Sequence, residues 1–287
     1  MTSAKDPSEL FSGLVDTIRK LNAGEIEPVV PRHAATVVML RDGADGPEVY
    51  LLRRTASMAF AAGAFVFPGG SVDPRDEDLD DDAWVGRSPA EWAKDLSCDE
   101  RLARALVCAA VRETFEESGV LLAGPDSSTV VEDTSGDDWE ADRLALIDRS
   151  LSLADFLRRR GLVVRGDLLR AWTHWLTPEV ESRRFDTRFF VAALPVGQRT
   201  RDVGGEADHV AWMKPQDAIA GSERGEMMLM PPTLASLRDL SEFGSVDAVL
   251  EAAAARTVTR ILPKLIFDAN DQLKFLLPHD ADYPHDS

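Results

Sequence analysis

Short apolar runs that predict strands occur early in the chain and again after its midpoint. Ala35–Leu40 and Val49–Arg54 are short and partly β-branched, and the turn between them is rich in Gly and Asp. This pattern predicts two strands joined by a turn. A third strand is predicted from Phe65. Pro68 ends it, because proline has no N–H to donate to a strand neighbour, and Gly69 and Gly70 follow. Further strands are predicted at 172–177, 184–193, 210–213, 260–267 and 274–277.

Apolar residues at helical spacing predict helices between and around these strands. The first helix is expected from a cap at Ser8 to an end near Gly24, and a longer one from about Asp99 into a glutamate-rich end. Ser152 has the spacing of a capping residue for a short helix. Later helices are predicted from Pro215, from a cap at Thr233 and from a cap at Ser245. The alternation of strands and helices favours a layered α/β or α+β domain with one mixed sheet.

The domain organisation is predicted from the linkers and acidic segments. We expect a helical arm over 1–33, a core domain over 34–230 and a helical and strand extension packed on that core over 231–287. Two insertions are predicted within the core domain, at about 71–99 and 124–166. The first is acidic, and we interpret it as a solvated surface segment, with metal binding as the alternative. Residues 133–142 of the second are expected to form an acidic loop.

Composition limits the classes of partner. The 287 residues carry a formal net charge of −18, which argues against nucleic acid and anionic membranes as partners because both favour basic patches. A phosphorylated small molecule remains compatible, since a metal ion can supply local positive charge. Two cysteines make no disulfide scaffold, and no run of eighteen apolar residues occurs. We therefore expect a cytoplasmic protein.

Three glutamates at i, i+3 and i+4 end the long predicted helix. Glu113, Glu116 and Glu117 would project from one helix face, where their like charges repel. A divalent cation removes the repulsion, and hard cations such as Mg2+ prefer clustered carboxylate oxygens. Gly119 follows and is suited to end the helix. The alternative is a solvated acidic helix end without a metal.

The segment 112–120 and the glycine turn upstream of it, Pro68–Gly70, together resemble the Nudix box. The pattern of that box is G-x5-E-x7-R-E-U-x-E-E-x-G-U, in which U is a bulky apolar residue. Gly70 stands at the first glycine, and Asp76 keeps the spacing of the first glutamate. Thr114 stands where an apolar residue is usual. Arg112 follows Gly70 by 42 positions, whereas the pattern has 14, so the acidic segment would be an insertion inside the box. The matching residues of the second half are Arg112, Glu113, Glu116, Glu117, Gly119 and Val120.

A second resemblance concerns the segment before the glycine turn. The extended signature of coenzyme A diphosphatases is L-L-T-x-R-S/A-x3-R-x3-G-x3-F-P-G-G. Arg54, Gly63 and Phe67–Gly70 fit its spacing, whereas Ala59 replaces its second arginine. The insertion and the segment 184–190 are most similar to the mammalian peroxisomal coenzyme A diphosphatase branch. The resemblance implies a Nudix-like α/β/α sandwich with a mixed sheet, helical insertions and extra terminal helices.

The resemblance also implies an activity and a set of site residues. The activity is hydrolysis, with Mg2+ or Mn2+, of a nucleoside diphosphate linked to another moiety. The first-choice substrate is coenzyme A or acyl-coenzyme A, giving 3′,5′-ADP and (acyl-)phosphopantetheine. The predicted catalytic residues are Glu113, Glu116, Glu117 and Arg112. The predicted metal ligands are the three glutamates with Glu206 from a later loop. The predicted substrate-binding residues are Arg54, Gly69, Gly70 and Arg184.

Alternatives remain open from the sequence. The substrate could be NADH, ADP-ribose or another dinucleotide, or the chain could be a non-catalytic binding module with the same fold. Arg54 could be a strand-edge surface residue, and Arg184 could anchor a structural carboxylate such as Asp186. Glu206 could be an exposed loop residue, and His174 is expected to be a hydrogen-bonded structural histidine. The apolar faces of the terminal segments could cover the chain's own core or form a homodimer.

Overall fold

A computed structural model describes residues 7–55, 62–201, 207–268, 270 and 272–284. The chain forms two compact units. Unit 1 comprises Met1–His33, His174–Asp186 and Thr259–Ser287, and unit 2 comprises Ala34–Thr173 and Thr187–Val258. The division into arm, core domain and extension predicted from the sequence stays a prediction.

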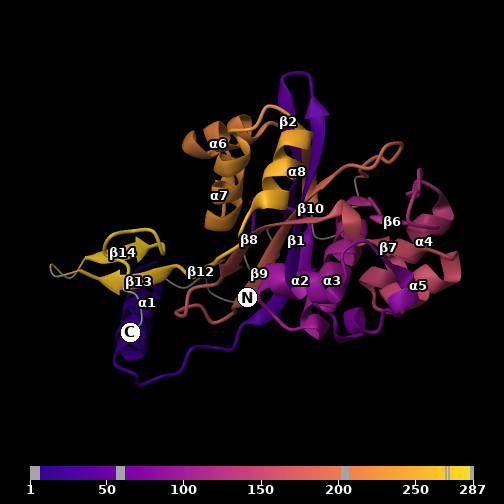
Figure 1. Cartoon of the computed structure of the whole chain (residues 1–287). Coiled ribbons are helices and arrows are strands. Elements are labelled where there is room, and N and C mark those ends of the chain that lie inside the picture. Colours follow the sequence, from indigo (N-terminus) through magenta and orange to yellow (C-terminus); the bar gives the residue numbers. More distant parts are fainter. Residues whose placement is uncertain (1–6, 56–61, 202–206, 269, 271, 285–287) are drawn as a thin grey trace, which may run out of the picture. The chain divides into compact units, whose positions relative to one another are not determined.

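A mixed sheet runs through unit 2 (Figure 1). Its strands neighbour one another in the order β11-β3-β2-β1-β9-β8, while β10 also pairs with β2 and β4 with β1. All of these pairs for which a direction is given are antiparallel except β11 with β3, which is parallel. The predicted mixed sheet is therefore confirmed. The strands are β1 (Arg32–Gly43), β2 (Gly46–Arg54), β3 (Ala64–Val66), β4 (Gly69–Ser71), β8 (Arg170–Leu176), β9 (Phe185–Ala193), β10 (Ala207–Met213) and β11 (Met228–Leu229).

Helices cover both faces of strand β1. Val37 and Met39 belong to one buried cluster with residues of α3 (Glu100–Ser118). Val38 and Leu40 point to the opposite face, because successive strand side chains alternate, and they are fully buried outside that cluster. Figure 1 shows α6 (Pro215–Glu223), α7 (Pro231–Leu240) and α8 (Val246–Ala255) on the side of β2 that lies away from α3. The layered α/β class is confirmed.

Helix α3 carries the predicted glutamate cluster and is the longest helix among the described residues. It begins where the Asp99 carboxylate accepts a 2.8 Å hydrogen bond from the Leu102 N–H, and it ends at Gly119 with φ of +73°. Apolar residues from Ala103 to Phe115 are buried on several sides of the helix. A helix enclosed in this way holds its polar end residues in fixed positions.

Unit 1 is built from the termini and a central hairpin segment. Helix α1 (Pro7–Asn22) confirms the predicted helix and begins before its expected cap, Ser8. The strand predicted over 260–267 is divided, because Pro263 lies between β12 (Arg260–Ile261) and β13 (Lys264–Phe267). Strand β13 pairs with β14 (Leu273–Leu276), and β12 pairs with β8 at His174 and Trp175.

The first insertion is only partly the predicted solvated segment. Its acidic residues Asp78, Asp80, Asp81 and Asp82 are exposed as expected, but the segment also contains regular elements and buried residues. It contains η1 (Pro74–Glu77), η2 (Asp81–Ala83), β5 (Trp84–Val85) and α2 (Pro89–Leu96). Trp92 and Leu96 are buried, and the Trp92 ring lies 5.6 Å from that of Phe190 in an edge-on contact. Acidic composition concealed this packing, because the apolar residues that anchor the segment are few and widely spaced.

The second insertion is also more regular than predicted. Helix α4 (Asp137–Ile147) replaces part of the loop expected over 133–142, and Trp139 packs against Phe115 and Phe156. Its acidic first turn suits a helix N-terminus, where the helix dipole favours negative charge. Helix α5 (Leu153–Arg160) has the predicted cap, since the Ser152 hydroxyl accepts a 3.1 Å hydrogen bond from the Asp155 N–H. The strands of this insertion are β6 (Ala123–Gly124) and β7 (Val163–Arg165), and β7 pairs with both β5 and β6.

The cap predicted at Thr233 is wrong, because α7 begins at Pro231 and Thr233 is buried within it. Within the described part of the chain, no helix has the length and apolar character needed to cross a membrane.

Candidate functional site

The glycine turn, Pro68–Gly70, leads into β4 and lies directly against the end of α3. The Gly69 N–H donates a 2.8 Å hydrogen bond to Glu117 Oε2. A side chain at Gly70 would place its Cβ 2.5 Å from Glu113 Oε1, which is too close for any real contact. Glycine at position 70 therefore leaves the space that the Glu113 carboxylate occupies, and a larger residue would displace that carboxylate. The predicted meeting of the two halves of the motif is present in the fold.

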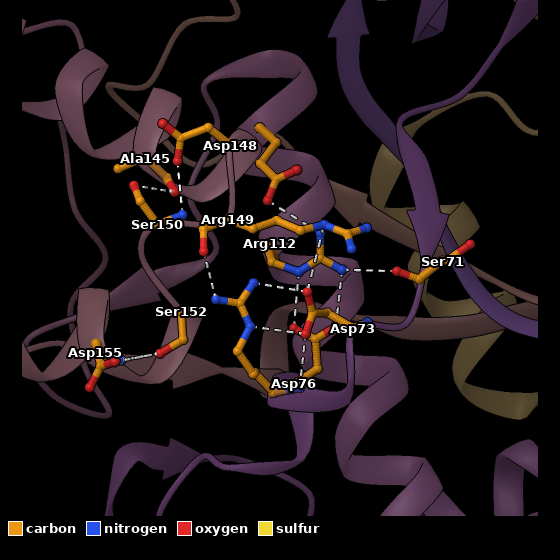
Figure 2. Close-up of polar contacts among 12 residues, drawn as sticks. Ser71, Asp73, Asp76, Arg112, Ala145, Asp148, Arg149, Ser150, Ser152 and Asp155 are labelled. Atoms are coloured by element: carbon orange, nitrogen blue, oxygen red, sulfur yellow. Dashed lines mark hydrogen bonds and ion pairs between the residues drawn. The ribbon is translucent and has the colours of Figure 1, made fainter.

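Arg112 joins the two halves through a buried network of ion pairs (Figure 2). Its Nε lies 2.9 Å from Asp76 Oδ1 and its Nη2 lies 3.0 Å from Asp76 Oδ2, so the pair is bidentate. Nη1 contacts Glu113 Oε1 at 2.7 Å and Glu116 Oε1 at 3.2 Å. Nη2 also donates to the Ser71 carbonyl at 3.0 Å. One guanidinium thus orients two of the three clustered glutamates and ties them to the segment after the glycine turn.

Asp76 is held as firmly as the arginine that it binds. It is 2% exposed and belongs to the capping box of η1, in which its Oδ2 accepts a 2.8 Å hydrogen bond from the Asp73 N–H. Asp76 keeps the spacing of the first glutamate of the Nudix pattern, and in this fold it is the ion-pair partner of Arg112. Its carboxylate therefore supports the cluster through Arg112.

Burial dominates the electrostatics of the cluster. It raises the pKa of Glu113 to about 7 and the pKa of Glu116 above its ordinary value, although Arg112 opposes both shifts. Burial also raises the pKa of Asp76 despite its two bonds to Arg112. Burial alone would lower the pKa of Arg112, but the surrounding carboxylates raise it, so this guanidinium stays charged. The carboxylates of the cluster therefore outnumber the guanidinium that faces them.

The donor set fits a hard divalent cation by its chemistry. One guanidinium faces the carboxylates of Asp76, Glu113 and Glu116, and Glu117 adds a fourth, so negative charge exceeds positive charge when all are ionised. A divalent cation would compensate much of this excess, and carboxylate oxygens are its preferred ligands. Among the residues that the structure describes, no three His, Cys, Asp or Glu side chains are already gathered as a formed metal site. Glu113 instead faces Arg112, and Glu117 faces the Gly69 N–H.

The fold accommodates Thr114 at a position where the Nudix pattern has an apolar residue. It is fully buried, and its hydroxyl donates a 2.7 Å hydrogen bond to the Ala110 carbonyl one turn earlier in α3. The hydroxyl is thus satisfied within the helix, and the methyl group is available for packing. Threonine is accommodated here without an unpaired polar group.

The structure places the remaining predicted site residues in different surroundings. Arg54 is half-buried at the end of β2, where its carbonyl accepts a hydrogen bond from the Gly63 N–H. Arg184 belongs to unit 1, is buried, and donates from Nε to the Thr177 carbonyl at 3.0 Å and from Nη1 to the Val29 carbonyl at 2.9 Å. Glu206 lies outside the described residues. The substrate role of Arg54 and Arg184 and the metal role of Glu206 stay predictions.

The histidine and carboxylate of unit 1 behave as structural residues. The His174 ring is hydrogen-bonded through Nε2 to Asp186 Oδ1, as predicted. His33 Nδ1 lies 3.4 Å from the other oxygen of Asp186. Burial lowers the pKa of Arg184, and the charge of Asp186 acts against this shift, so the alternative that Arg184 anchors this carboxylate stays a prediction.

Three arginines near the cluster were not predicted from the sequence. Arg143 is buried, and its Nη1 donates a 2.6 Å hydrogen bond to the Glu116 carbonyl near the end of α3. Arg75 binds both oxygens of Asp73 and also donates to the Arg149 carbonyl at 3.0 Å. Arg149 lies beside Asp73 and lowers the pKa of Glu116, against the larger effect of burial. No spacing rule marks these residues, because they come from insertions whose fold is not evident from the sequence.

Comparison with known proteins identifies the family. A sequence model of the NUDT19 Nudix domain matches residues 87–240. The chain belongs to the NUDT19 branch of the Nudix hydrolase family. The matched region contains the glutamate helix but begins after the glycine turn and Asp76. The packing of that turn on α3 is therefore seen in the structure and not in the sequence match.

Named relatives extend the likeness to most of the chain. The acyl-coenzyme A diphosphatase NUDT19 of Homo sapiens is 30% identical over a region covering 85% of this chain and 74% of that protein. The acyl-coenzyme A diphosphatase NUDT19 of Xenopus laevis is 28% identical, covering 83% and 72% respectively. The crystal structure of a Nudix hydrolase from Alicyclobacillus acidocaldarius has a TM-score of 0.65 and 30% identity, covering 78% of this chain and 96% of that one.

Proposed function

We propose that this protein is a metal-dependent Nudix diphosphatase that hydrolyses coenzyme A or acyl-coenzyme A. The products would be 3′,5′-ADP and phosphopantetheine or its acyl derivative. The observation that carries the proposal is the packing of the glycine turn on the glutamate helix, in which Gly69 contacts Glu117 and Gly70 leaves room for Glu113. The choice of coenzyme A is supported by the relatives named acyl-coenzyme A diphosphatase, of which this chain covers nearly three quarters.

Each residue of the cluster has a separate task in this proposal. Asp76 holds Arg112, Arg112 holds Glu113 and Glu116, and the Gly69 N–H holds Glu117. The glutamates would hold a divalent cation, which supplies charge neutralisation for the phosphate oxygens and makes a water more acidic. Hydrolysis breaks one P–O bond of the diphosphate, adds hydroxide from water to that phosphorus and leaves a proton on the departing phosphate. Positioning and charge carry most of such a reaction.

A substrate panel tests the proposed activity. The purified chain is incubated with Mg2+ or Mn2+ and with coenzyme A, acetyl-coenzyme A, NADH or ADP-ribose, and products are identified by mass spectrometry. Release of 3′,5′-ADP and phosphopantetheine is expected. Turnover of NADH or ADP-ribose without turnover of either coenzyme A compound would refute the substrate assignment.

Substitutions in the cluster test the site. Glu116→Gln and Glu117→Gln are each expected to lower kcat by about a hundredfold or more while the circular dichroism spectrum is retained, because each removes a charged ligand. Glu100→Gln is the matched control, since Glu100 is an exposed glutamate in the first turn of the same helix. Equal activity of Glu116→Gln, Glu117→Gln and the control would refute the metal-site assignment.

The metal, the compartment and the assembly are further parts of the proposal. Mg2+ and Mn2+ are both suited to carboxylate ligands, and activity lost in EDTA and restored by each metal separately would compare them. A cytoplasmic location is supported by Cys98 and Cys108, which form no disulfide in the part of the chain that the structure describes. A homodimer through the terminal segments stays a prediction that light scattering on the purified protein would test.

A further inference from the structure

Arg149 has a backbone conformation that its side chain disfavours. It follows α4 and has φ of +64°, a region that residues with a Cβ rarely adopt. The residues with positive φ directly after α3 and α5 are Gly119 and Gly161, which adopt this conformation readily, whereas Arg149 lies two positions after the end of α4. Among the described residues, Ser97 is the one other non-glycine residue with positive φ. The end of α4 thus carries an arginine where glycine would be less strained.

The neighbours of the site hold this strained residue in place (Figure 2). Its carbonyl accepts a 3.0 Å hydrogen bond from Arg75 Nη1, and the same guanidinium is bound to Asp73. Its N–H donates to the Leu146 carbonyl at 3.0 Å. The Asp148 carboxylate accepts a 2.8 Å hydrogen bond from the Ser150 N–H and so fixes the flanking turn. The position of Arg149 is therefore set by the segment that follows the glycine turn.

The side chain of Arg149 lies beside the acidic cluster but is mostly open to solvent. Its side chain is 74% exposed, and its Nε lies 3.9 Å from Asp73 Oδ2, a carboxylate that Arg75 already binds at both oxygens. Arg112 and Arg143, by contrast, are buried. Of these four arginines, Arg149 has the most exposed side chain, and Arg75, at 36% exposed, is engaged with Asp73.

We propose that Arg149 pairs with the diphosphate of the bound substrate and so positions it over the glutamate cluster. The inference rests on the proposed function and adds a residue of the second insertion to the site. An anionic diphosphate needs positive charge beside a cluster that is itself acidic, and a guanidinium binds two phosphate oxygens at once. Backbone strain at an exposed residue next to a binding site is expected where position matters more than stability. Arg149 is a substrate-positioning residue in this assignment.

Binding of a nucleoside diphosphate analogue tests the contact without turnover. The Kd of α,β-methylene-ADP with Mg2+ is measured by calorimetry for the wild type, Arg149→Gln and Arg149→Gly. Both variants are expected to bind about tenfold more weakly, as for the loss of one charged hydrogen-bonding contact. Arg149→Gly is expected to have a Tm at or above that of the wild type, because glycine relieves the strain. A lower Tm for this variant would overturn the strain argument.

The control is an exposed arginine of the same insertion. Arg158 has a side chain that is 61% exposed and pairs with Asp155 and Asp80. Arg158→Gln is expected to bind the analogue with wild-type affinity. Unchanged affinity in both Arg149 variants, or an equal loss in Arg158→Gln, would overturn the proposal.

Kinetics distinguish the diphosphate from the 3′-phosphate. Arg149→Gln is expected to raise KM about tenfold for both coenzyme A and dephospho-coenzyme A, because the two share the diphosphate. A rise confined to coenzyme A would assign Arg149 to the 3′-phosphate and overturn the proposal, as would a fall in kcat with unchanged KM. A wild type that turns over neither compound would refute the proposed substrate, while the binding experiment would still decide the role of Arg149.

Discussion

Removal of the Asp76 charge is the most direct test of how the two halves of the motif are held together. Asp76→Asn keeps the size of the side chain but replaces one carboxylate oxygen by an amide. At present Asp76 accepts two bonds from Arg112 and one from the Asp73 N–H. The amide of asparagine can serve only some of these donors, and its own N–H groups would point towards a guanidinium or a backbone N–H.

The expected loss of stability in Asp76→Asn depends on the burial of the ion pair and on the carboxylates that still face Arg112. Breaking a buried ion pair by removing one partner costs about 3–5 kcal/mol, because the other charge is left in the interior. Glu113 and Glu116 still face Arg112 in the variant and compensate part of its charge. We therefore expect the free energy of unfolding to fall by about 3 kcal/mol, at the low end of this range. Such a loss corresponds to a fall in Tm of about 6–12 °C.

The assay is urea unfolding followed by tryptophan fluorescence, with Tm from circular dichroism. Glu77→Gln is the control, since Glu77 lies next to Asp76 and pairs with Arg101, whose side chain is exposed. Such a surface pair is worth about 1 kcal/mol or less. Asp76→Asn with the stability of the wild type, or with no greater loss than Glu77→Gln, would show that Arg112 does not depend on Asp76 for its place in the fold.

Three further predictions concern single positions. Gly70→Ala should lower kcat with little change in Tm, because its Cβ would displace only the Glu113 side chain, whereas Gly69→Ala should lower Tm, because its Cβ would lie 2.5 Å from the Ala35 carbonyl oxygen. Hydrogen bonding by Arg75 lowers the pKa of Asp73 to about 2, so this carboxylate stabilises the fold above about pH 4 and loses that contribution towards pH 2. Asp73→Asn should flatten urea-measured stability over this range. Thr114→Val should change the free energy of unfolding by about 1 kcal/mol or less, because the Ala110 carbonyl is also the acceptor of a helix hydrogen bond.

The elements of the core could be predicted from the sequence because local pattern and burial agree there. The strands β1, β2, β8 and β9 and the helix α3 were all expected from apolar runs or helical spacing. The insertions were not, because a few buried residues decide them. Trp92 anchors α2 and Trp139 anchors α4, and neither stands out within segments dominated by acidic residues. The start of α7 was misplaced because two prolines can occupy the first turn of a helix as well as precede it.

The site was predictable to the extent that it lies within contiguous motifs. The helix spacing of the glutamates and the glycine turn indicated that the two would meet, and the hydrogen bond from Gly69 to Glu117 shows that contact. The sequence could not show that Asp76 is buried on Arg112, since its spacing alone was compatible with an exposed loop residue. Nothing in the sequence indicated a role for Arg149, because an exposed arginine after an acidic helix is common. Only its backbone conformation, seen in the structure, distinguishes it.

The extra length inside the motif is tolerated because it falls after Asp76. Six positions separate Gly70 from Asp76, as in the Nudix pattern, whereas 36 separate Asp76 from Arg112 in place of eight. Loop-closure entropy grows by only about 0.6 kcal/mol per doubling of length, so this lengthening costs about 1.3 kcal/mol. Burial of Trp92 and Leu96 offsets that cost, since each buried side chain of this size contributes about 1.5–3 kcal/mol. The first insertion can therefore vary in length without separating the ion pair of Asp76 and Arg112, and it packs beside a second insertion that brings Arg149 to Asp73.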